Sequence, residues 1–155
     1  MSEKAFQDYW DHNECWGCGA KNPHGLHIKS HWSEEDSVSE WIPLERYKAG
    51  PDGFLNGGII ATLVDCHSVA TAIADCYREE ERGLDTEPLI WCVTASMKID
   101  YHRPVSTSEP VNLKAKIVKR EGRKITVECE LYSGGKVCVR GDVLAVKVPA
   151  DKWYG

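Results

Sequence analysis

The stretch that decides the fold is Gly53-Phe-Leu-Asn-Gly-Gly-Ile-Ile-Ala-Thr-Leu-Val-Asp65, which continues as Cys66-His-Ser-Val-Ala-Thr-Ala-Ile-Ala-Asp75. From Ile59 to Ile73 nearly every residue is small or apolar, on all sides of a helical wheel. A helix that is apolar on every side is a buried helix. We therefore predict one long core helix, from about Asn56 to about Glu80, which the rest of the chain must cover.

Two polar features of this helix point to a reaction site. Asp65 lies near the middle, where a buried carboxylate is costly unless another group pairs with it or a reaction uses it. Asn56-Gly57-Gly58 begins the helix and leaves free backbone N–H groups, which suit a negative or polarised oxygen. Gly57 and Asp65 are separated by about 12 Å along the axis, so they cannot both reach one carbonyl group. If both act on one substrate, two chains must contribute to each site.

Length, charge and cysteine content narrow the class of protein. The 155 residues predict one globular domain, and 28% of them are charged, which is typical of a soluble protein. A net charge of −5 disfavours general nucleic-acid binding, which needs a basic face. We find no apolar span that suggests a membrane and no secretory signal. Seven cysteines in such a chain indicate reduced thiols in the cytoplasm.

The segments on either side of the helix predict strands. Residues 1–25 lack periodicity and predict an irregular arm, with a short helix around Ala5 to Asp11. Apolar and polar residues alternate over Leu26–Trp32 and Val38–Ile42, which predicts a hairpin. Four further strands are expected after Pro88, and they cover residues 89–102, 111–117, 125–131 and 136–148. The apolar phase of the last strand slips at Arg140-Gly141, which predicts a β-bulge there.

The order of two strands, one apolar helix and four strands predicts an α+β domain. A single helix this apolar is buried when one antiparallel sheet wraps around it and packs the apolar face of the sheet against the helix. We expect this domain to cover residues 26–149, after the arm (1–25) and before a C-terminal tail (150–155). The exposed edges of such a sheet favour lateral pairing with a second copy.

The chain resembles the hotdog fold, and within it the PaaI-type acyl-CoA thioesterases, in three segments. Gly57–Asp65 looks like the His-Gly-Gly…Asp helix of that family. Cys15-x-x-Cys18-Gly19…Asn22-Pro23-x-Gly25-Leu26 is similar to the N-terminal segment of one large branch, and Ala95–Pro104 looks like the strand that follows the helix. The usual histidine is Asn56 here, and Gly50 stands where related enzymes often carry a water-placing amide. Asn56 can donate a hydrogen bond but does not titrate near neutral pH.

The resemblance implies hydrolysis of an acyl-CoA thioester at a dimer interface. It casts the Gly57 N–H as the oxyanion donor and Asp65 as the general base or nucleophile, with Asn56 and Thr94 beside them. It implies a homodimer or a dimer of dimers, and no cofactor, because CoA is part of the substrate. Three basic residues at strand ends are candidates for the CoA phosphates: Arg103, Arg123 and Lys124. The expected substrate pocket, suited to an apolar or aromatic acyl group, contains Phe54, Gly58, Ile60 and Trp91.

Several alternatives stay open. The chain could be a non-catalytic protein that binds acyl-CoA or another small ligand without the histidine, or a hydratase, although hydratases of this fold usually need an Asp/His pair. Asp65 could be an internal hydrogen-bond anchor, and Thr94 an ordinary β-branched strand residue.

Two cysteine-containing patterns also suggest chemistry. Cys66 and His67 are neighbours on a helix and point about 100° apart, so we interpret both as packing residues. Cys15-x2-Cys18-x8-His27-x3-His31 could bind zinc. Its linker is shorter than that of a zinc finger, and the two histidines fall well apart on a predicted strand, so we predict no metal site.

Overall fold

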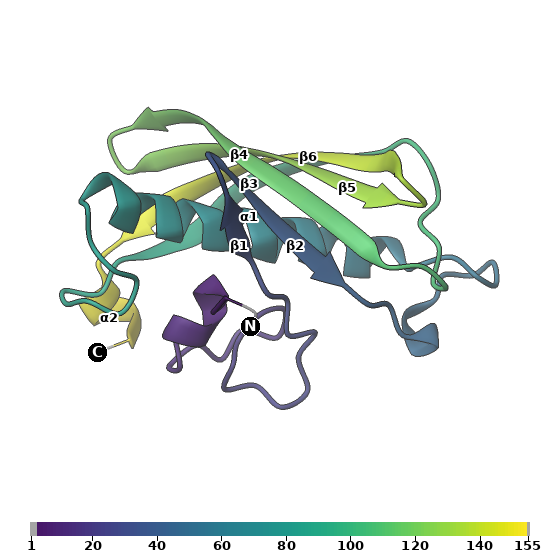
Figure 1. Cartoon of the computed structure of the whole chain (residues 1–155), viewed down its shortest axis with the longest axis horizontal. Helices are drawn as coiled ribbons and strands as arrows, with labels where there is room; N and C mark the ends of the chain where they lie inside the picture. Colours follow the sequence, from purple (N-terminus) through teal and green to yellow (C-terminus); the bar gives the residue numbers. More distant parts are fainter. Residues whose placement is uncertain (1–2, 155) are drawn as a thin grey trace.

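The chain folds into three layers: a curved sheet, one long helix beneath it, and an N-terminal arm beneath the helix (Figure 1). This computed structural model describes residues 3–154, so residues 1, 2 and 155 of the predicted arm and tail lie outside the described residues. The sheet is antiparallel and six-stranded, with the order β1-β2-β4-β5-β6-β3. The expected architecture, one antiparallel sheet packed on one long central helix, is confirmed.

The elements are η1 (Phe6–Tyr9), β1 (His31–Ser33), β2 (Asp36–Trp41), η2 (Glu45–Tyr47), α1 (Gly57–Glu79), β3 (Trp91–Tyr101), β4 (Val111–Glu121), β5 (Lys124–Ser133), β6 (Lys136–Val148) and α2 (Ala150–Tyr154).

The central helix α1 begins where the sequence predicts. Asn56 is its N-cap, and the side-chain Oδ1 accepts hydrogen bonds from the backbone N–H of Gly58 at 2.7 Å and of Ile59 at 3.2 Å. The expectation of no membrane-length apolar span needs correction, because α1 is long and apolar enough by length and composition. However, 67% of its most apolar window is buried inside the molecule, as in the core helix of a soluble protein.

One stripe of α1 stays open, although the predicted helix is apolar all round. Leu63 and Val64 are fully buried against the sheet, whereas residues about one turn apart on another side are only half-buried: Ala61, Thr62, Asp65 and Val69. The sheet covers one side of the helix and the arm covers another. The remaining side, next to β3, is therefore not covered within one chain.

The predicted position of the bulge in β6 is wrong. The bulge lies at Cys138, because Leu131 pairs with Val139 while Tyr132 pairs with Val137. Gly141 occupies an inward position, where an added Cβ would lie 2.6 Å from Val64 Cγ1. Because α1 approaches so closely, this inward position has no room for a side chain. The absence of an apolar side chain at Gly141 made the alternation of apolar and polar residues look displaced.

The first predicted hairpin is shorter than expected. Residues 26–30 form no backbone ladder with β2, because their N–H groups turn to the arm: Leu26 N–H donates to Trp16 O at 3.0 Å, and Ile28 N–H to Gly17 O at 3.3 Å. His27 has a positive φ of 55°, which no regular strand accommodates. The helix predicted around Ala5 to Asp11 is a single 3₁₀ turn, η1.

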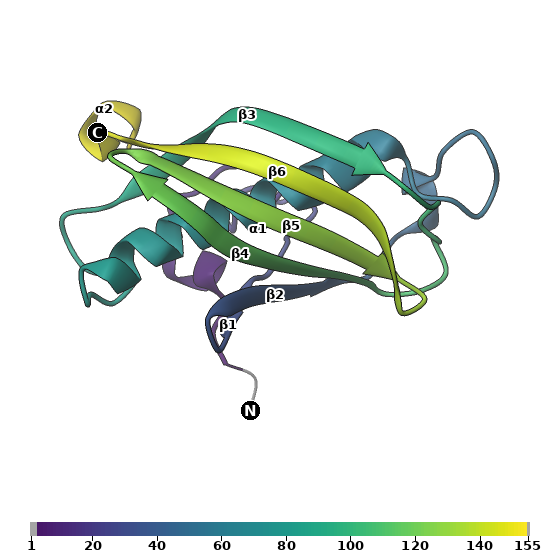
Figure 2. The ribbon, with the colours of Figure 1, turned by 90° about the horizontal axis from the view of Figure 1, so that it is seen from above.

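The arm belongs to the same core as the helix and sheet. Phe6 and Trp10 are buried, and Trp10 packs edge-on against Trp91 with ring centroids 5.6 Å apart. At the side of the sheet, β3 pairs only with β6, and no strand within residues 3–154 pairs with its outer edge (Figure 2). The arm therefore closes the bottom of the helix and leaves the β3 side open.

Candidate active site

Asp65 lies on the open stripe of α1 and is half-buried, not dry as the sequence suggests. Thr94, from the adjacent edge strand β3, donates its hydroxyl to Asp65 Oδ1 at 2.6 Å. Burial raises the pKa of the Asp65 carboxyl, the Thr94 hydrogen bond opposes that rise, and the negative charge of Cys15 adds to it. The helix and the strand together hold one oriented carboxylate with an increased affinity for a proton.

Asp65 and Thr94 open into a cleft of about 470 Å³ between the arm, α1, β3 and α2. The cleft wall is largely aromatic and aliphatic, with Trp10, Val69, Ile73, Trp91, Val93 and Trp153. The structure thus brings together three of the predicted site residues: Asp65, Thr94 and Trp91. A polar group at the mouth of an apolar cleft is the usual arrangement of a small-molecule site.

A second cluster forms at the N-terminus of α1. Among the described residues the Gly57 N–H has no hydrogen-bond partner, because the Asn56 side chain caps Gly58 and Ile59 instead. The Tyr101 hydroxyl donates to Gly57 O at 2.7 Å and so connects the end of β3 to the helix start. Gly57 therefore presents a free N–H at the positive end of a 23-residue helix, where it can bind a developing oxyanion.

The predicted substrate pocket is divided between these two clusters. Phe54 is 40% exposed and Gly58 is exposed, both near the start of α1, whereas Trp91 lines the cleft beside Asp65. Ile60 lines neither place, because it points into the core and is only 3% exposed. The expectation that Ile60 lines the pocket is wrong, because its side chain lies on the side of α1 that packs against the sheet.

The three candidate phosphate-binding residues do not come together in one chain. Arg103 follows β3 beside the end where Tyr101 pairs with Val139, whereas Lys124 starts β5 and pairs with Val146 at the opposite end of the sheet. Arg123 immediately precedes Lys124, in the turn between β4 and β5. A strand of this length places the two ends about 25 to 35 Å apart. A single phosphate group bound to one chain can therefore contact basic residues at one end or the other.

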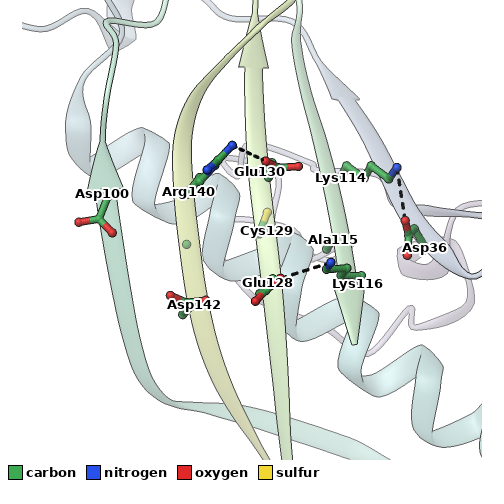
Figure 3. A pocket seen from close by; sticks show the side chains of 11 residues that line it. Asp36, Asp100, Lys114, Ala115, Lys116, Glu128, Cys129, Glu130, Arg140 and Asp142 are labelled. Carbon is green, nitrogen blue, oxygen red and sulfur yellow. Dashed lines mark ion pairs between the residues drawn. The ribbon is translucent and has the colours of Figure 1, made fainter. Parts of the chain in front are cut away.

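The outer face of the sheet carries a polar hollow of about 480 Å³ (Figure 3). Its charged residues pair across strands: Lys114 with Asp36 at 3.4 Å, Lys116 with Glu128 at 3.5 Å, and Arg140 with Glu130 at 3.2 Å. These cations are already neutralised by neighbouring carboxylates. The face is a solvated surface with mutually paired charges.

The sequence interpretation missed a cluster of three cysteines beside Asp65. Cys15 and Cys18 of the arm and Cys66 of α1 place their three Sγ atoms within 4.8 Å of one another. The exposed His27 and the half-buried His31 are not part of the group. The only available signals were the Cys15-x-x-Cys18 spacing and the position of Cys66 next to Asp65; the contact across 51 residues is set by the tertiary fold.

Cys66 and His67 face different parts of the molecule, as the helical spacing predicts. His67 is fully buried, with Nδ1 2.8 Å from Ser30 Oγ and Nε2 3.1 Å from Ser37 Oγ. Burial lowers the pKa of His67 to about 4, so the ring is neutral near pH 7. It ties α1 to β2 and to the segment before β1, and it does not reach the Asp65 carboxylate.

Comparison with known proteins places this geometry in a family context. Residues 52–139 match the family described as the thioesterase superfamily. The chain is similar to acyl-coenzyme A thioesterase THEM4 of Xenopus laevis, with 33% identity over 87 residues, which are 56% of this chain and 33% of that protein. Its match to the Rattus norvegicus THEM4 has 29% identity and covers 66% of this chain and 40% of that protein. The chain thus spans a third to two fifths of the length of these curated relatives.

Solved structures are also similar. A thioesterase superfamily protein from Shewanella loihica PV-4 is 33% identical, with a TM-score of 0.65, over 83% of this chain and 97% of that chain. A putative thioesterase from Ralstonia eutropha JMP134, described as phenylacetic acid degradation-related, is 16% identical with a TM-score of 0.64, over 78% of this chain and 85% of that chain. The second likeness shows the fold alone.

Proposed function

Because the chain belongs to the thioesterase superfamily, we propose that it hydrolyses acyl-CoA thioesters to a free acid and CoA. The observation that carries this proposal is the half-buried Asp65 carboxylate, held by the Thr94 hydroxyl at 2.6 Å at the mouth of an apolar cleft. Burial raises the pKa of Asp65, which makes the carboxylate a better proton acceptor than an exposed one.

In this proposal the Gly57 N–H donates a hydrogen bond to the thioester carbonyl oxygen and stabilises the charge that develops there. Asp65 removes a proton from water, and the water oxygen attacks the carbonyl carbon. The tetrahedral intermediate then collapses, the C–S bond breaks, and CoA leaves as a thiolate that takes up the proton. Direct attack by Asp65, giving an anhydride that water opens, is the second route.

We propose that each site is shared between two chains. Gly57 and Asp65 are separated by about 12 Å on one helix, so one thioester cannot contact both in the same chain. The open stripe of α1 and the outer edge of β3 form a continuous uncovered face. Met97, 39% exposed, and Tyr101, 51% exposed, are apolar side chains on this face. A homodimer, or a dimer of dimers, that covers it places Gly57 of one chain opposite Asp65 of the other.

The finer assignment to the PaaI-type enzymes, and the substrate it implies, is part of the proposal. Trp10, Trp91 and Trp153 around the cleft suit an apolar or aromatic acyl group. For the CoA phosphates we propose Arg103 or the pair Arg123 and Lys124, which lie at opposite ends of the sheet. We place this activity in the cytoplasm, in accord with seven free cysteines.

One observation favours a second function. The Asn56 side chain is engaged as a helix cap and lacks the titratable ring expected at this position, which suits a protein that binds acyl-CoA without hydrolysing it. A hydratase is disfavoured, because His67 is bound by Ser30 and Ser37 and does not face Asp65.

The decisive experiment is a screen of purified protein against a panel of short, long and aromatic acyl-CoA substrates, with release of free thiol as the readout. We expect turnover that falls by about 100-fold to 10,000-fold in Asp65→Asn, which removes the base and keeps its shape. Asp142→Asn, an exposed carboxylate on the outer face of the sheet, is the control and should keep full activity.

Two results would contradict this function. Absence of thiol release across the panel, together with calorimetric binding of an acyl-CoA, would favour the binding protein. Full turnover in Asp65→Asn would overturn the assignment of Asp65.

A further inference from the structure

The cysteine cluster has the spacing of ligands around one ion. Cys15 Sγ and Cys66 Sγ are 3.7 Å apart, and all three sulfurs lie within 4.8 Å of one another. Thiolates bound to tetrahedral zinc at about 2.3 Å lie about 3.8 Å apart. A disulfide would need sulfurs about 2.0 Å apart. The observed separation therefore matches the edge of a metal-centred tetrahedron better than a covalent bridge.

The loop that carries Cys15 and Cys18 is built to present both sulfurs. Asn13 Oδ1 accepts from the Cys15 N–H at 3.0 Å, and Gly19 N–H donates to Cys15 O at 2.8 Å, which closes a tight turn. Asn13 Nδ2 donates to Cys18 Sγ at 3.6 Å. Such donors orient sulfur ligands and stabilise their negative charge.

Gly17 lets this loop reach α1. A Cβ added at Gly17 would lie 2.2 Å from Cys66 Sγ and 2.9 Å from Thr62 Cγ2, so only glycine permits this approach. The close contact between the Gly17 backbone and α1 thus brings the Cys66 sulfur to those of Cys15 and Cys18. This contact leaves no room for a side chain. Cys66 also supplies what His27 and His31 do not, namely a further ligand at the correct distance.

The three thiols interact directly with one another. Hydrogen bonds from Cys18 and Cys66 lower the pKa of Cys15, and the bond to Cys15 raises the pKa of both Cys18 and Cys66.

We propose that Cys15, Cys18 and Cys66 bind one zinc ion, as three thiolates that leave a fourth position for water or another ligand. This site lies on the wall of the same cleft as Asp65, since all four residues line it. The ion fastens the arm to α1 beside the carboxylate. Metal binding by these three sulfurs does not require thioester hydrolysis, so the two proposals can fail separately.

The test is a metal measurement on the full chain, purified under reducing conditions without chelator. We expect about one zinc per chain by mass spectrometry of the elements. After the zinc is removed, titration with Co²⁺ should give thiolate-to-cobalt charge-transfer bands and the intense visible bands of a tetrahedral site. Cys66→Ser should weaken metal binding by more than about 100-fold, because even outer partners of a metal ligand are worth 10- to 100-fold.

The control is Cys76→Ser, which removes another thiol of α1 outside the cluster and should bind zinc and cobalt as the wild type does. Circular dichroism of each variant shows that the fold is retained, and Cys15→Ser in the loop serves if Cys66→Ser does not fold. Unchanged metal binding in the folded ligand variants would overturn the proposal. So would a folded, reduced wild type with neither zinc nor cobalt bands, or one in which Cys15 and Cys66 form a disulfide.

Discussion

Asn56 stands where the thioesterase resemblance expects a histidine, and its side chain caps the helix. The oxygen of Asn56 holds the N–H groups of Gly58 and Ile59, which leaves the Gly57 N–H free among the described residues. Because the proposed oxyanion donor is a backbone group, the loss of the histidine does not remove it. What the residue at the histidine position contributes here is the cap of the helix.

The role of the Gly57 N–H can be tested by replacing Gly57 with proline, which has no backbone N–H. Gly57 is the first residue of α1, a position that favours proline, and Asn56 has φ −60° and ψ 135°, which suits a residue before proline. We expect Gly57→Pro to fold and to lower kcat/KM for acyl-CoA by about two to three orders of magnitude. Steady-state thiol release measures this loss, and circular dichroism verifies the helix.

Gly57→Ala is the matched variant, because it keeps the N–H and adds a Cβ at an ordinary 3.7 Å from the Tyr101 ring. It should keep most of the activity. Equal activity in Gly57→Pro and Gly57→Ala would show that the N–H of this residue plays no part in the reaction.

At the level of single residues, the sequence could indicate only those members of the candidate site that lie in local patterns. Asp65 and the free N–H of Gly57 follow from the helix alone, and Thr94 was placed by resemblance. Cys66 was not predicted as a partner of Cys15, because that contact joins segments 51 residues apart through the packing of the arm. No local period of the chain encodes it.

At the level of elements, long periodic segments were predicted well and short ones were not. The helix α1 and the strands β3–β6 bury enough apolar surface for their patterns to decide the structure. Residues 26–30 alternate like a strand, but the arm provides other hydrogen-bond partners for them. Tertiary context therefore overrides a pattern of only five residues.

Helix α1 is fastened to its surroundings by His67, and this contact should make stability depend on pH. Burial lowers the pKa of His67 from its usual 6.5 to about 4 in the folded chain. The unfolded chain therefore binds the proton more readily, so the stabilisation is complete above pH 6.5 and is lost as the pH falls toward 4. Between pH 7 and pH 5 the free energy of unfolding should fall by about 2 kcal/mol from this residue.

Urea unfolding of the wild type and of His67→Gln at both pH values isolates the contribution. The glutamine variant should be less stable at pH 7, because a well-placed ring is lost, but its stability should change less as the pH falls. His24→Gln, at an exposed position of the arm, should follow the wild type. Parallel pH profiles for wild type and His67→Gln would show that the buried ring does not control the acid sensitivity.

At the level of the whole molecule, residues 3–154 present two separate clusters of candidate site residues and one uncovered face. The Gly57 cluster and the Asp65 cluster lie at different points of α1, and the stripe between them is open beside the unpaired edge of β3. The sequence led to this conclusion through the helical rise alone. It could not show which side of the helix stays open, because that depends on where the arm packs.

A shared site predicts complementation between two defective chains. In a two-fold dimer of Asp65→Asn with Gly57→Pro, one site carries both substitutions and the other carries neither. Co-expression in equal amounts makes half of the dimers mixed, so the preparation should recover about a quarter of the wild-type activity, although each variant alone is nearly inactive. Thiol release per chain and light scattering measure the recovery and the assembly together.

Co-expression of Asp65→Asn with Asp65→Ala is the control, since every mixed dimer then lacks an intact carboxylate and recovers nothing. Activity no higher than this control in the Gly57→Pro mixture, or full activity in a particle with the mass of one chain, would contradict the shared site. Recovery near one quarter would instead assign Gly57 and Asp65 to opposite chains of one catalytic centre. Gly57 and Asp65 of one chain are about 12 Å apart on α1, about eight helical steps. The substrate would then not have to span this distance, because it contacts Gly57 of one chain and Asp65 of the other.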